Sequence, residues 1–485
     1  MTVKASDPSH EQRQILRNSA VLAAARIIER ATNLVMALLI SRQLGVSALG
    51  AYATATAYFL LISVAGEAGV TNLIVREISK DRSRTNSLVS HACAIVTIAS
   101  LVLMAAAWAI IPHLGYSAEL RTGIAVIVLA LLPLTLNTVQ EGVFVAYQRV
   151  ELQTWTTLGG SIVTVVASFL LLRGGHGVVS LLAVFVAAEY GVTVVYFVLI
   201  NRCIHKLHVE FHRSIAREFL LDLRPFVASS VLAAAFARPE IIILSFVGSP
   251  AQVGYYSAAA KVVEVWQFLP QTYMVNVFPV LARSYAAGGR MVGDVLDRAI
   301  RNLLLVAFPI SVGIAATAGP IVTTLYGPEF GPAVPVLRVL SVSVVLYCMH
   351  SVLWRILSAR GQQGAVVRVQ VVSLIVRLGV GYALILRYGA LGAAITLPLS
   401  LALHNALLRF AVRSDGTRLA VVRNAWPYAV AAGVMGIAVL VAPSAVSLWG
   451  LIAIGVVVYG GALLALNRFY DSRVLMVNTP LSPNP

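Results

Sequence analysis

Charged residues are scarce in this sequence. Asp, Glu, Lys and Arg together make up 12% of the 485 residues, whereas a soluble domain carries about 25%. Hydrophobic residues account for 59% of the chain, and its mean hydropathy is +0.85. This balance excludes an ordinary soluble domain and is typical of a polytopic membrane protein.

Cysteine is almost absent as well. The three cysteines, Cys93, Cys203 and Cys348, lie far apart, a pattern that predicts neither a disulfide framework nor a metal site. The histidines in or beside apolar segments are His91, His113, His350 and His404. These histidines fall on different segments without the spacing of metal ligands, so we interpret them as packing residues. The sequence predicts no metal and no cofactor.

Two signatures of enzymes are missing. No Gly-x-x-x-x-Gly-Lys-Ser/Thr phosphate loop occurs, which argues against ATP binding by this chain. The predicted outward loops are short, and one of the larger ones, residues 326–335, holds only Glu329 as an acidic residue. A membrane enzyme such as a polysaccharide polymerase or a lipid-dependent glycosyltransferase would need a larger outward catalytic loop. We therefore predict a transporter without catalytic residues.

Long apolar runs dominate what is present. Fourteen stretches are long enough to cross a bilayer as helices, which takes about 20 residues each. We therefore predict an all-α polytopic membrane protein with about 14 transmembrane helices. The stretches are 15–41, 50–70, 88–111, 121–146, 154–172, 178–200, 225–247, 254–282, 302–325, 335–358, 366–386, 390–412, 425–442 and 448–468.

The distribution of Lys and Arg predicts the orientation. With the N-terminus in the cytoplasm, 26 of the 36 Lys and Arg residues fall in cytoplasmic tails, loops and helix ends, and four fall on the opposite side. This positive-inside bias supports the helix count and predicts a multi-pass protein of the cytoplasmic (inner) membrane with both termini in the cytoplasm. It also accounts for the net charge of +16, so no nucleic-acid partner is inferred.

An internal repeat divides the predicted helices into two lobes. Residues 50–55 (Gly-Ala-Tyr-Ala-Thr-Ala) return as residues 254–259 (Gly-Tyr-Tyr-Ser-Ala-Ala), and residues 172–177 are echoed by residues 386–392. An even number of helices separates the copies. The repeat is therefore parallel, with a pseudo-two-fold axis along the membrane normal, an architecture found in transporters. Chance recurrence of Gly, Ala and Tyr is the alternative.

The predicted organisation follows from this repeat. A cytoplasmic tail precedes an N-lobe of helices 1–6, and a basic cytoplasmic loop leads to a C-lobe of helices 7–12. Two further helices have no counterpart in the repeat. Within the inter-lobe loop, residues 209–222 fit either an interfacial helix or a plain linker. The boundaries are 1–14 (N-terminal tail), 15–200 (N-lobe), 201–224 (loop), 225–412 (C-lobe), 425–468 (helices 13 and 14) and 469–485 (C-terminal tail).

Polar residues interrupt the first apolar stretch at membrane depth. Arg26, Glu29, Arg30 and Asn33 have the spacing of a single helix face. A charge at the bilayer centre costs about 2.5–3.5 kcal/mol, so this face is predicted to line protein or a watery cavity. A structural ion-pair seam between helices is the alternative, although one carboxylate does not neutralise two guanidinium groups.

Further charges recur near mid-depth in later stretches. Lys261 and Glu264 are three residues apart and are expected to pair. Because a charged side chain that faces lipid costs free energy, these mid-depth residues are predicted to face the protein interior. Carboxylates at such depth are also candidates for carrying a coupled proton. The additional residues are Glu189, Arg238, Glu240, Lys261, Glu264 and Arg377, with Glu67 and Glu141 nearer cytoplasmic helix ends.

Several hairpin motifs resemble those of a known family. Residues 39–45 (LISRQLG) and 49–52 (LGAY) are similar to its first hairpin, and residues 240–244 (EIIIL) with 253–259 (VGYYSAA) to the start of its second half. Residues 388–394 (YGALGAA) resemble its hairpin between helices 11 and 12. On these motifs the chain resembles the Wzx-type polysaccharide or O-antigen flippases of the multidrug/oligosaccharidyl-lipid/polysaccharide (MOP) exporter superfamily, which have a MATE-like fold.

The resemblance implies a function. Two six-helix lobes around a central cavity would move polyprenyl-diphosphate-linked oligosaccharide to the outer leaflet by alternating access, in polysaccharide, O-antigen or exopolysaccharide biosynthesis. The implied partners are this lipid-linked oligosaccharide, membrane lipids and other polysaccharide-assembly membrane proteins. Arginine suits a diphosphate because its planar fork offers several donors. The candidate headgroup residues are Arg26, Arg30, Arg238, Lys261 and Arg377, and the candidate cavity or proton-coupling residues are Glu29, Glu67, Glu189, Glu240 and Glu264.

Two alternatives stay open at this point. A lipid II-type flippase would transport a closely related substrate. A cation-coupled multidrug exporter of the same superfamily would favour an acidic cavity, and the small basic excess among the intramembrane charges argues mildly against it.

Overall fold

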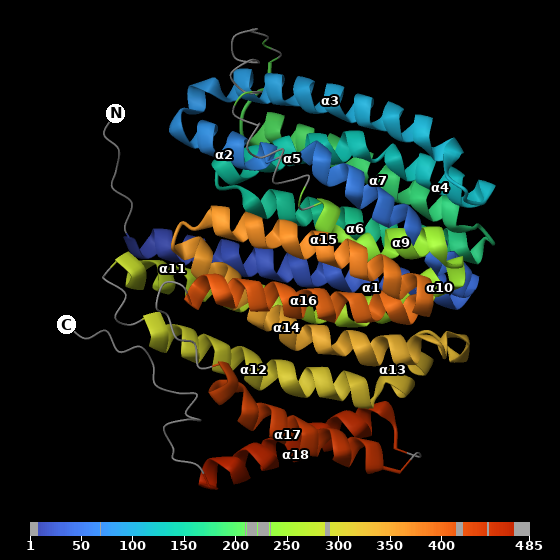
Figure 1. Ribbon diagram of the computed structural model, residues 1–485. Helices are drawn as coiled ribbons and strands as arrows, with labels where there is room; N and C mark the ends of the chain where they lie inside the picture. The colour runs from blue at the N-terminus through green and yellow to red at the C-terminus, as the bar shows by residue number, and fades with distance from the viewer. Residues whose placement is uncertain are drawn as a thin grey trace. The chain divides into compact units, whose positions relative to one another are not determined.

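A computed structural model describes residues 8–67, 69–208, 210, 221, 232, 234–286, 292–413, 421–443 and 446–469. Every regular element in these ranges is a helix (Figure 1), which confirms the predicted all-α class. The chain forms two compact units, residues 1–254 and 255–485. The lobe boundaries predicted from the sequence stay predictions. The stretch 209–222 lies outside the described residues except at positions 210 and 221.

The first unit is built from long helices joined by short connections. Two single 3-10 turns, η1 (Arg82–Arg84) and η2 (Ile111–His113), flank α3. The start of α10 also belongs to this unit. Its helices are α1 (Pro8–Glu67), α2 (Val70–Lys80), α3 (Thr85–Ile110), α4 (Ala118–Val128), α5 (Leu131–Ala146), α6 (Val150–Arg173), α7 (Val178–Cys203), α9 (Pro239–Val247) and the first residues of α10 (Pro250–Glu264).

Helix α1 contains the first predicted span and most of the second, 50–70. They are separated by a single non-helical residue, Gly45, whose backbone has φ 80° and ψ −172°. A positive φ of this size is readily adopted by glycine because it lacks a Cβ atom. The connection within the predicted first hairpin, residues 39–45 and 49–52, is therefore a one-residue kink at Gly45 between two helical segments.

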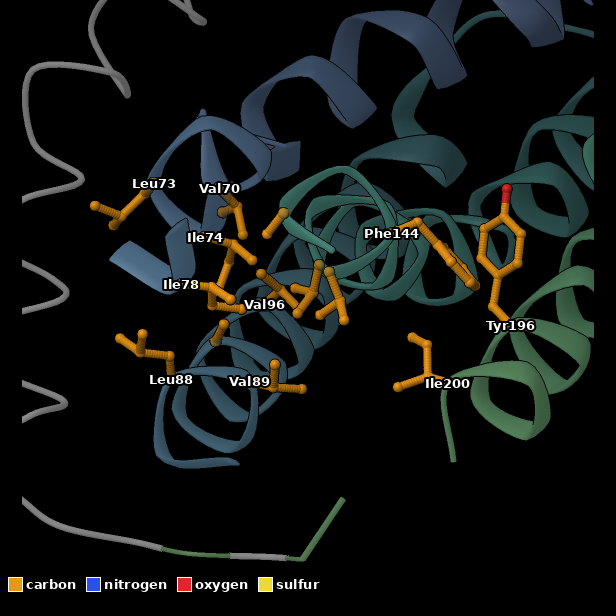
Figure 2. Packing of buried hydrophobic residues seen from close by; sticks show 14 residues of the cluster. Val70, Leu73, Ile74, Ile78, Leu88, Val89, Val96, Phe144, Tyr196 and Ile200 are labelled. Atoms are coloured by element: carbon orange, nitrogen blue, oxygen red, sulfur yellow. The ribbon is translucent and has the colours of Figure 1, made fainter. Parts of the chain in front are cut away.

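One hydrophobic core of the first unit lies between α2, α3, α5 and α7. Figure 2 shows Ile74 and Ile78 of α2 facing α3, with Phe144 of α5 beside Tyr196 of α7. The rings of Phe144 and Tyr196 meet edge to face, with centroids 5.1 Å apart. Burying these apolar side chains positions α5 and α7 side by side, so polar residues on their facing surfaces are brought together.

The second unit contains the remaining helices. The predicted span 254–282 is divided by a 3-10 turn, η3 (Val265–Gln267), and a further 3-10 turn, η4 (Pro328–Phe330), precedes α14. The helices are α10 after residue 254, α11 (Phe268–Ala286), α12 (Val292–Ala316), α13 (Ala318–Leu325), α14 (Ala333–Ala359), α15 (Gln363–Tyr388), α16 (Ala390–Arg413), α17 (Val421–Val441) and α18 (Leu448–Phe469).

The two helices without a counterpart in the repeat, α17 and α18, pack against α12 (Figure 1). Met435 and Tyr459 form a small buried cluster with residues of α12. The Tyr459 hydroxyl donates a hydrogen bond to the backbone carbonyl of Leu305, 2.7 Å away. This pair of helices is thus fixed to the unit by both apolar packing and a hydrogen bond.

The helices have the length and surface of membrane spans. In the described ranges, ten are long and apolar enough to cross a bilayer, and the apolar segment 425–441 is shorter. Large apolar side chains are exposed on them, including Trp155 at 71%, Ile98 at 63% and Phe410 at 77%. Such surfaces are compatible with lipid and not with water. The chain is a multi-pass membrane protein.

Candidate transport site

The predicted polar face of the first helix lies on α1. The backbone is helical at positions 26, 29, 30 and 33, so these positions share one face as expected. Asn33 is exposed. The side chains of Arg26, Glu29, Arg30 and Glu67 lie outside the described part of the chain, and their predicted roles stay predictions.

Glu189 belongs to a polar network inside the first unit. Asn137 of α5 is 4% exposed, and its amide nitrogen donates to Glu189 Oε2 of α7 at 3.1 Å. The amide oxygen of Asn137 lies 2.8 Å from the hydroxyl of Thr193, which donates to it. One asparagine thus bridges a carboxylate and a hydroxyl on the neighbouring helix. Both its donor and its acceptor are used, as a buried amide requires.

A second carboxylate lies farther along the same two helices. The hydroxyl of the buried Tyr196 is 3.5 Å from Glu141 Oε1 and 2.8 Å from the hydroxyl of Thr157 on α6. Sequence reasoning placed Glu141 near a solvated helix end and did not connect it with Tyr196. The i,i+4 spacing of Asn137 and Glu141 was available in the sequence. It puts both residues on one face of α5 and so predicts a polar strip there.

Arg238 and Glu240 lie at the start of α9. Arg238 is the residue before the helix, Pro239 is its first residue, and Glu240 occupies the first turn, where it is 2% exposed. A carboxylate in the first turn of a helix is stabilised by the backbone dipole. The sequence Arg-Pro-Glu therefore forms a helix start that holds a buried acidic residue in place.

Lys261 and Glu264 form the ion pair expected from their spacing. The Lys261 Nζ to Glu264 Oε2 distance is 3.2 Å, and both side chains are largely buried. This confirms the i,i+3 pairing. It also means that each charge partly neutralises the other, so Lys261 is not a bare cation.

Arg377 lies in a polar seam inside the second unit. It is 9% exposed, and Ser373, one helical turn before it on α15, is 1% exposed. His404 of α16 interacts electrostatically with Arg377, and its ring is 4.9 Å from the ring of His350 on α14. Two histidines interpreted as separate packing residues are thus neighbours. Parallel packing of α14 against α16 brings them together, and this was not visible in their sequence spacing.

The structure brings together only part of the predicted set. Lys261 meets Glu264, Glu189 meets Asn137, and Arg377 meets His404. Asn137, His350 and His404 were outside the predicted set. Within the described residues, no group of three or more His, Cys, Asp or Glu side chains has the arrangement of a metal site.

Comparison with known proteins identifies the family. The profile of the family described as "Polysaccharide biosynthesis protein" matches residues 39–335, more than half of the chain. The chain belongs to this family. A second profile, described as "Lipid II flippase MurJ", matches residues 269–459. The resemblance to polysaccharide flippases inferred from the hairpin motifs is confirmed.

Two relatives come from the archaeon Haloferax volcanii. "Probable low-salt glycan biosynthesis flippase Agl15" is 27% identical over 182 residues, which cover 37% of this chain and 39% of the relative. "Probable flippase AglR" is 28% identical over 247 residues, which cover 48% of this chain and 51% of the relative. The matched segments thus span about half or less of the length of these relatives.

Solved structures share the fold. A lipid II flippase MurJ in an inward closed conformation has a TM-score of 0.79 and 17% identity, with 93% of this chain and 99% of that chain covered. An inward-facing MATE transporter of the MOP superfamily has a TM-score of 0.64 and 14% identity, with coverage of 80% and 96%. The predicted MATE-like fold is confirmed.

Proposed function

We propose that this protein flips polyprenyl-diphosphate-linked oligosaccharide across the cytoplasmic membrane for polysaccharide biosynthesis. The observation that carries the proposal is the match of the polysaccharide biosynthesis family over residues 39–335. The names of the two archaeal relatives point the same way, because both are called flippases. The polar groups held inside membrane-spanning helices supply a chemical reason, since a charged headgroup needs polar partners to cross an apolar barrier.

The headgroup contacts belong to the cationic side chains at membrane depth. In the first unit these are Arg26, Arg30 and Arg238, and in the second they are Lys261 and Arg377. A diphosphate accepts several hydrogen bonds at once, and arginine supplies them in a fixed planar fork. The pairing of Lys261 with Glu264 makes Lys261 the weakest of these candidates, because a diphosphate must compete with a carboxylate already in place.

The carboxylates have a separate role in this proposal. Glu29, Glu67, Glu189, Glu240 and Glu264 balance the cations and offer sites for a coupled proton. Glu189 is the best supported of them. Its hydrogen bond from Asn137 holds the carboxylate between two membrane-spanning helices, where gain or loss of a proton would change the packing of α5 against α7.

The membrane and the partners are also proposed. The positive-inside bias places both termini in the cytoplasm, and the polysaccharide family suggests the cytoplasmic membrane of the producing cell. Other polysaccharide-assembly membrane proteins are the proposed protein partners. The protein acts as a transporter in this proposal and needs no cofactor.

Reconstitution tests the proposal directly. The full chain is placed in liposomes with a fluorescent polyprenyl-diphosphate oligosaccharide, and the fraction of label accessible to an impermeant quencher is followed. Transfer of label between leaflets is expected with the protein and not with empty liposomes. Matched liposomes with fluorescent lipid II or a cationic dye separate the two alternatives. A folded, reconstituted protein that moves the dye and neither lipid would refute the proposed function.

A further inference from the structure

A ladder of buried polar residues runs between α15 and α16 in the second unit. On α15, Ser373, Arg377 and Gly381 follow at intervals of four residues and therefore share a face. A Cβ atom on Gly381 would crowd the side-chain methyl of Thr396 on α16, which shows how closely the two helices approach. Thr396 and His404 lie on one face of α16 at i and i+8. The ladder therefore runs from the contact of Gly381 with Thr396 toward Arg377 and His404.

Helix α14 adds the third side of this ladder. The amide nitrogen of Asn405 on α16 donates to the backbone carbonyl of Leu346 on α14, 2.9 Å away. One turn along α14 from Leu346 is His350, whose ring meets the ring of His404 at an interplanar angle of 71° and a centroid distance of 4.9 Å. The two imidazoles are thus held on two helices whose register is fixed by a hydrogen bond.

The polar atoms here are only partly satisfied. His350 Nδ1 and Ser373 Oγ are buried and accept or donate no hydrogen bond within the described part of the chain. A buried polar atom without a partner costs free energy, because it has lost its hydrogen bonds to water without replacement. Retaining such groups inside a membrane protein therefore calls for a functional reason.

The charge around the pair limits when it can bind a proton. A protonated imidazole at His404 would be repelled by Arg377, which interacts with it electrostatically, and a charge on His350 would be repelled by one on His404. An anion near Arg377 would remove much of that repulsion and stabilise an imidazolium. Histidine is the side chain whose charge changes most easily near neutral pH.

We propose that His350 and His404 form a protonation site that takes up a proton when a phosphate-bearing ligand binds near Arg377. The ligand part of this inference rests on the proposed function. Binding of the anion therefore favours binding of the proton at this site, and the anion does not displace the proton. His350 and His404 thereby act as positioning residues for the charge of the ligand.

Other ionisable groups on the surrounding helices interact with neighbours of their own. On α14, the Arg355 guanidinium lies over the rings of Phe278 and Trp354. On α12, Arg301 interacts with Tyr428 of α17, and on α10 Lys261 pairs with Glu264. Further ionisable groups on these helices are Asp297 and Arg298 of α12, Arg338, Tyr347 and Cys348 of α14, Arg368, Tyr382, Arg387 and Tyr388 of α15, and Arg409 of α16.

Calorimetry measures the proton directly. The purified full chain in nanodiscs is titrated with farnesyl diphosphate in two buffers of different ionisation enthalpy at about pH 7, and the difference in heat gives the protons taken up per bound ligand. The same titration is made with His350→Gln, His404→Gln and the double variant. His113→Gln is the matched control, because His113 is exposed in η2. The double variant also gives the baseline for proton release or uptake by the diphosphate itself.

Wild type and the His113→Gln control are expected to take up about one proton more than the double variant, and their affinity should rise up to about tenfold for each unit of falling pH. A second measurement needs no variant: nitrogen-15 spectra of histidine-labelled wild type should show two of the nine histidines changing on ligand binding, and together these two should gain about one positive charge. Equal proton uptake in wild type and the double variant, or unchanged histidine spectra on binding, would overturn the inference. Absence of farnesyl diphosphate binding by folded wild type would instead overturn the proposed function, and the ligand-linked proton with it.

Discussion

Gly50 of α1 lies against Pro250 at the start of α10, so close that a Cβ atom on Gly50 would overlap the carbonyl oxygen of Pro250. The relation is reciprocal, because a Cβ atom on Gly254 would overlap the carbonyl oxygen of Val46. In the internal repeat Gly50 corresponds to Gly254 and Val46 to Pro250. The same contact is therefore made twice with the roles exchanged, which small residues permit by letting backbones touch.

Adding a methyl group at Gly50 or Gly254 should disrupt this crossing of α1 and the start of α10. Gly50→Ala and Gly254→Ala each place a Cβ atom on a backbone carbonyl that cannot move away as a side chain would. We expect a clear fall in the yield of monodisperse protein and in the melting temperature in detergent, and a larger fall for the double variant.

The matched control for this prediction is Gly159→Ala. Gly159 lies in helix α6 with open space where the Cβ atom would be. Alanine there should leave the melting temperature unchanged or raise it, because the higher helix propensity of alanine stabilises the helix by about 1 kcal/mol at most. Equal behaviour of Gly159→Ala and Gly50→Ala would show that the crossing tolerates a side chain.

The bridge between Asn137 and Glu189 should be coupled energetically. Asn137→Leu keeps the size of the side chain but removes the donor to Glu189, which should cost about 1–3 kcal/mol of stability. Replacing both residues with leucine removes the stranded carboxylate as well, so the double variant should lose less than the sum of the single losses. Unfolding in detergent measures the cycle, and strictly additive losses would show that the 3.1 Å contact contributes little.

The arginines of α1 are expected to act in transport. Arg30→Glu should abolish export of the lipid-linked oligosaccharide while the protein stays inserted in the membrane, because the introduced carboxylate would repel the diphosphate. Arg30→Lys keeps the charge but loses the planar fork, so it should retain part of the activity. Full export by a stable variant with both Arg26→Ala and Arg30→Ala would eliminate a headgroup role for them.

A structural role for the same arginines makes a different prediction. In that case Arg30→Glu should lower abundance and melting temperature, and exchanging the charges with Glu29→Arg and Arg30→Glu should restore both. Arg149→Ala serves as the control for loss of a basic residue, since Arg149 is exposed beyond the end of α5. Export and melting are measured on the same preparations.

The topology predicts which positions an impermeant thiol reagent can reach. In intact cells, single cysteines at Ser9, Ser214 and Ser472 should resist labelling, whereas one at Ser249 should react, because Ser249 is exposed in a predicted outward loop. Labelling of Ser214→Cys from outside would overturn the helix count.

This test needs a cysteine-free parent. Cys93, Cys203 and Cys348 are free thiols, and Cys203 is exposed at the end of α7. They are replaced before single cysteines are introduced, and permeabilised cells show that each protected position becomes reactive once the reagent enters. A position that stays unreactive after permeabilisation is buried and says nothing about sidedness, so it is replaced by its neighbour.

Hydrophobic run length predicted most of the fold. The spans 335–358, 366–386 and 390–412 fall within α14, α15 and α16, because a stretch that must cross lipid is apolar along its whole length. The breaks within spans were missed. The predicted span 121–146 is divided between α4 and α5, and 302–325 between α12 and α13. Apolar residues continue across both breaks, so composition carries no signal of them.

The candidate site was less predictable. The pairing of Lys261 with Glu264 follows from local spacing on one helix and was anticipated. The meeting of His350 with His404, and of Asn137 with Glu189, depends on which helices are neighbours and on their register. The pattern of apolar residues in a single sequence does not predict which helices are neighbours or how they are aligned along each other, since lipid-facing and protein-facing surfaces are similarly apolar.

The kink at Gly45 is a connection without a loop. Loops usually absorb insertions and deletions, but here a single residue with φ 80° is the whole connection between two membrane-spanning segments. A residue added within the helical turn on either side of Gly45 would rotate the adjoining part of that segment by about 100° around its axis, turning lipid-facing side chains toward the interior. Epitope tags and split points for fragment complementation should therefore be placed away from Gly45.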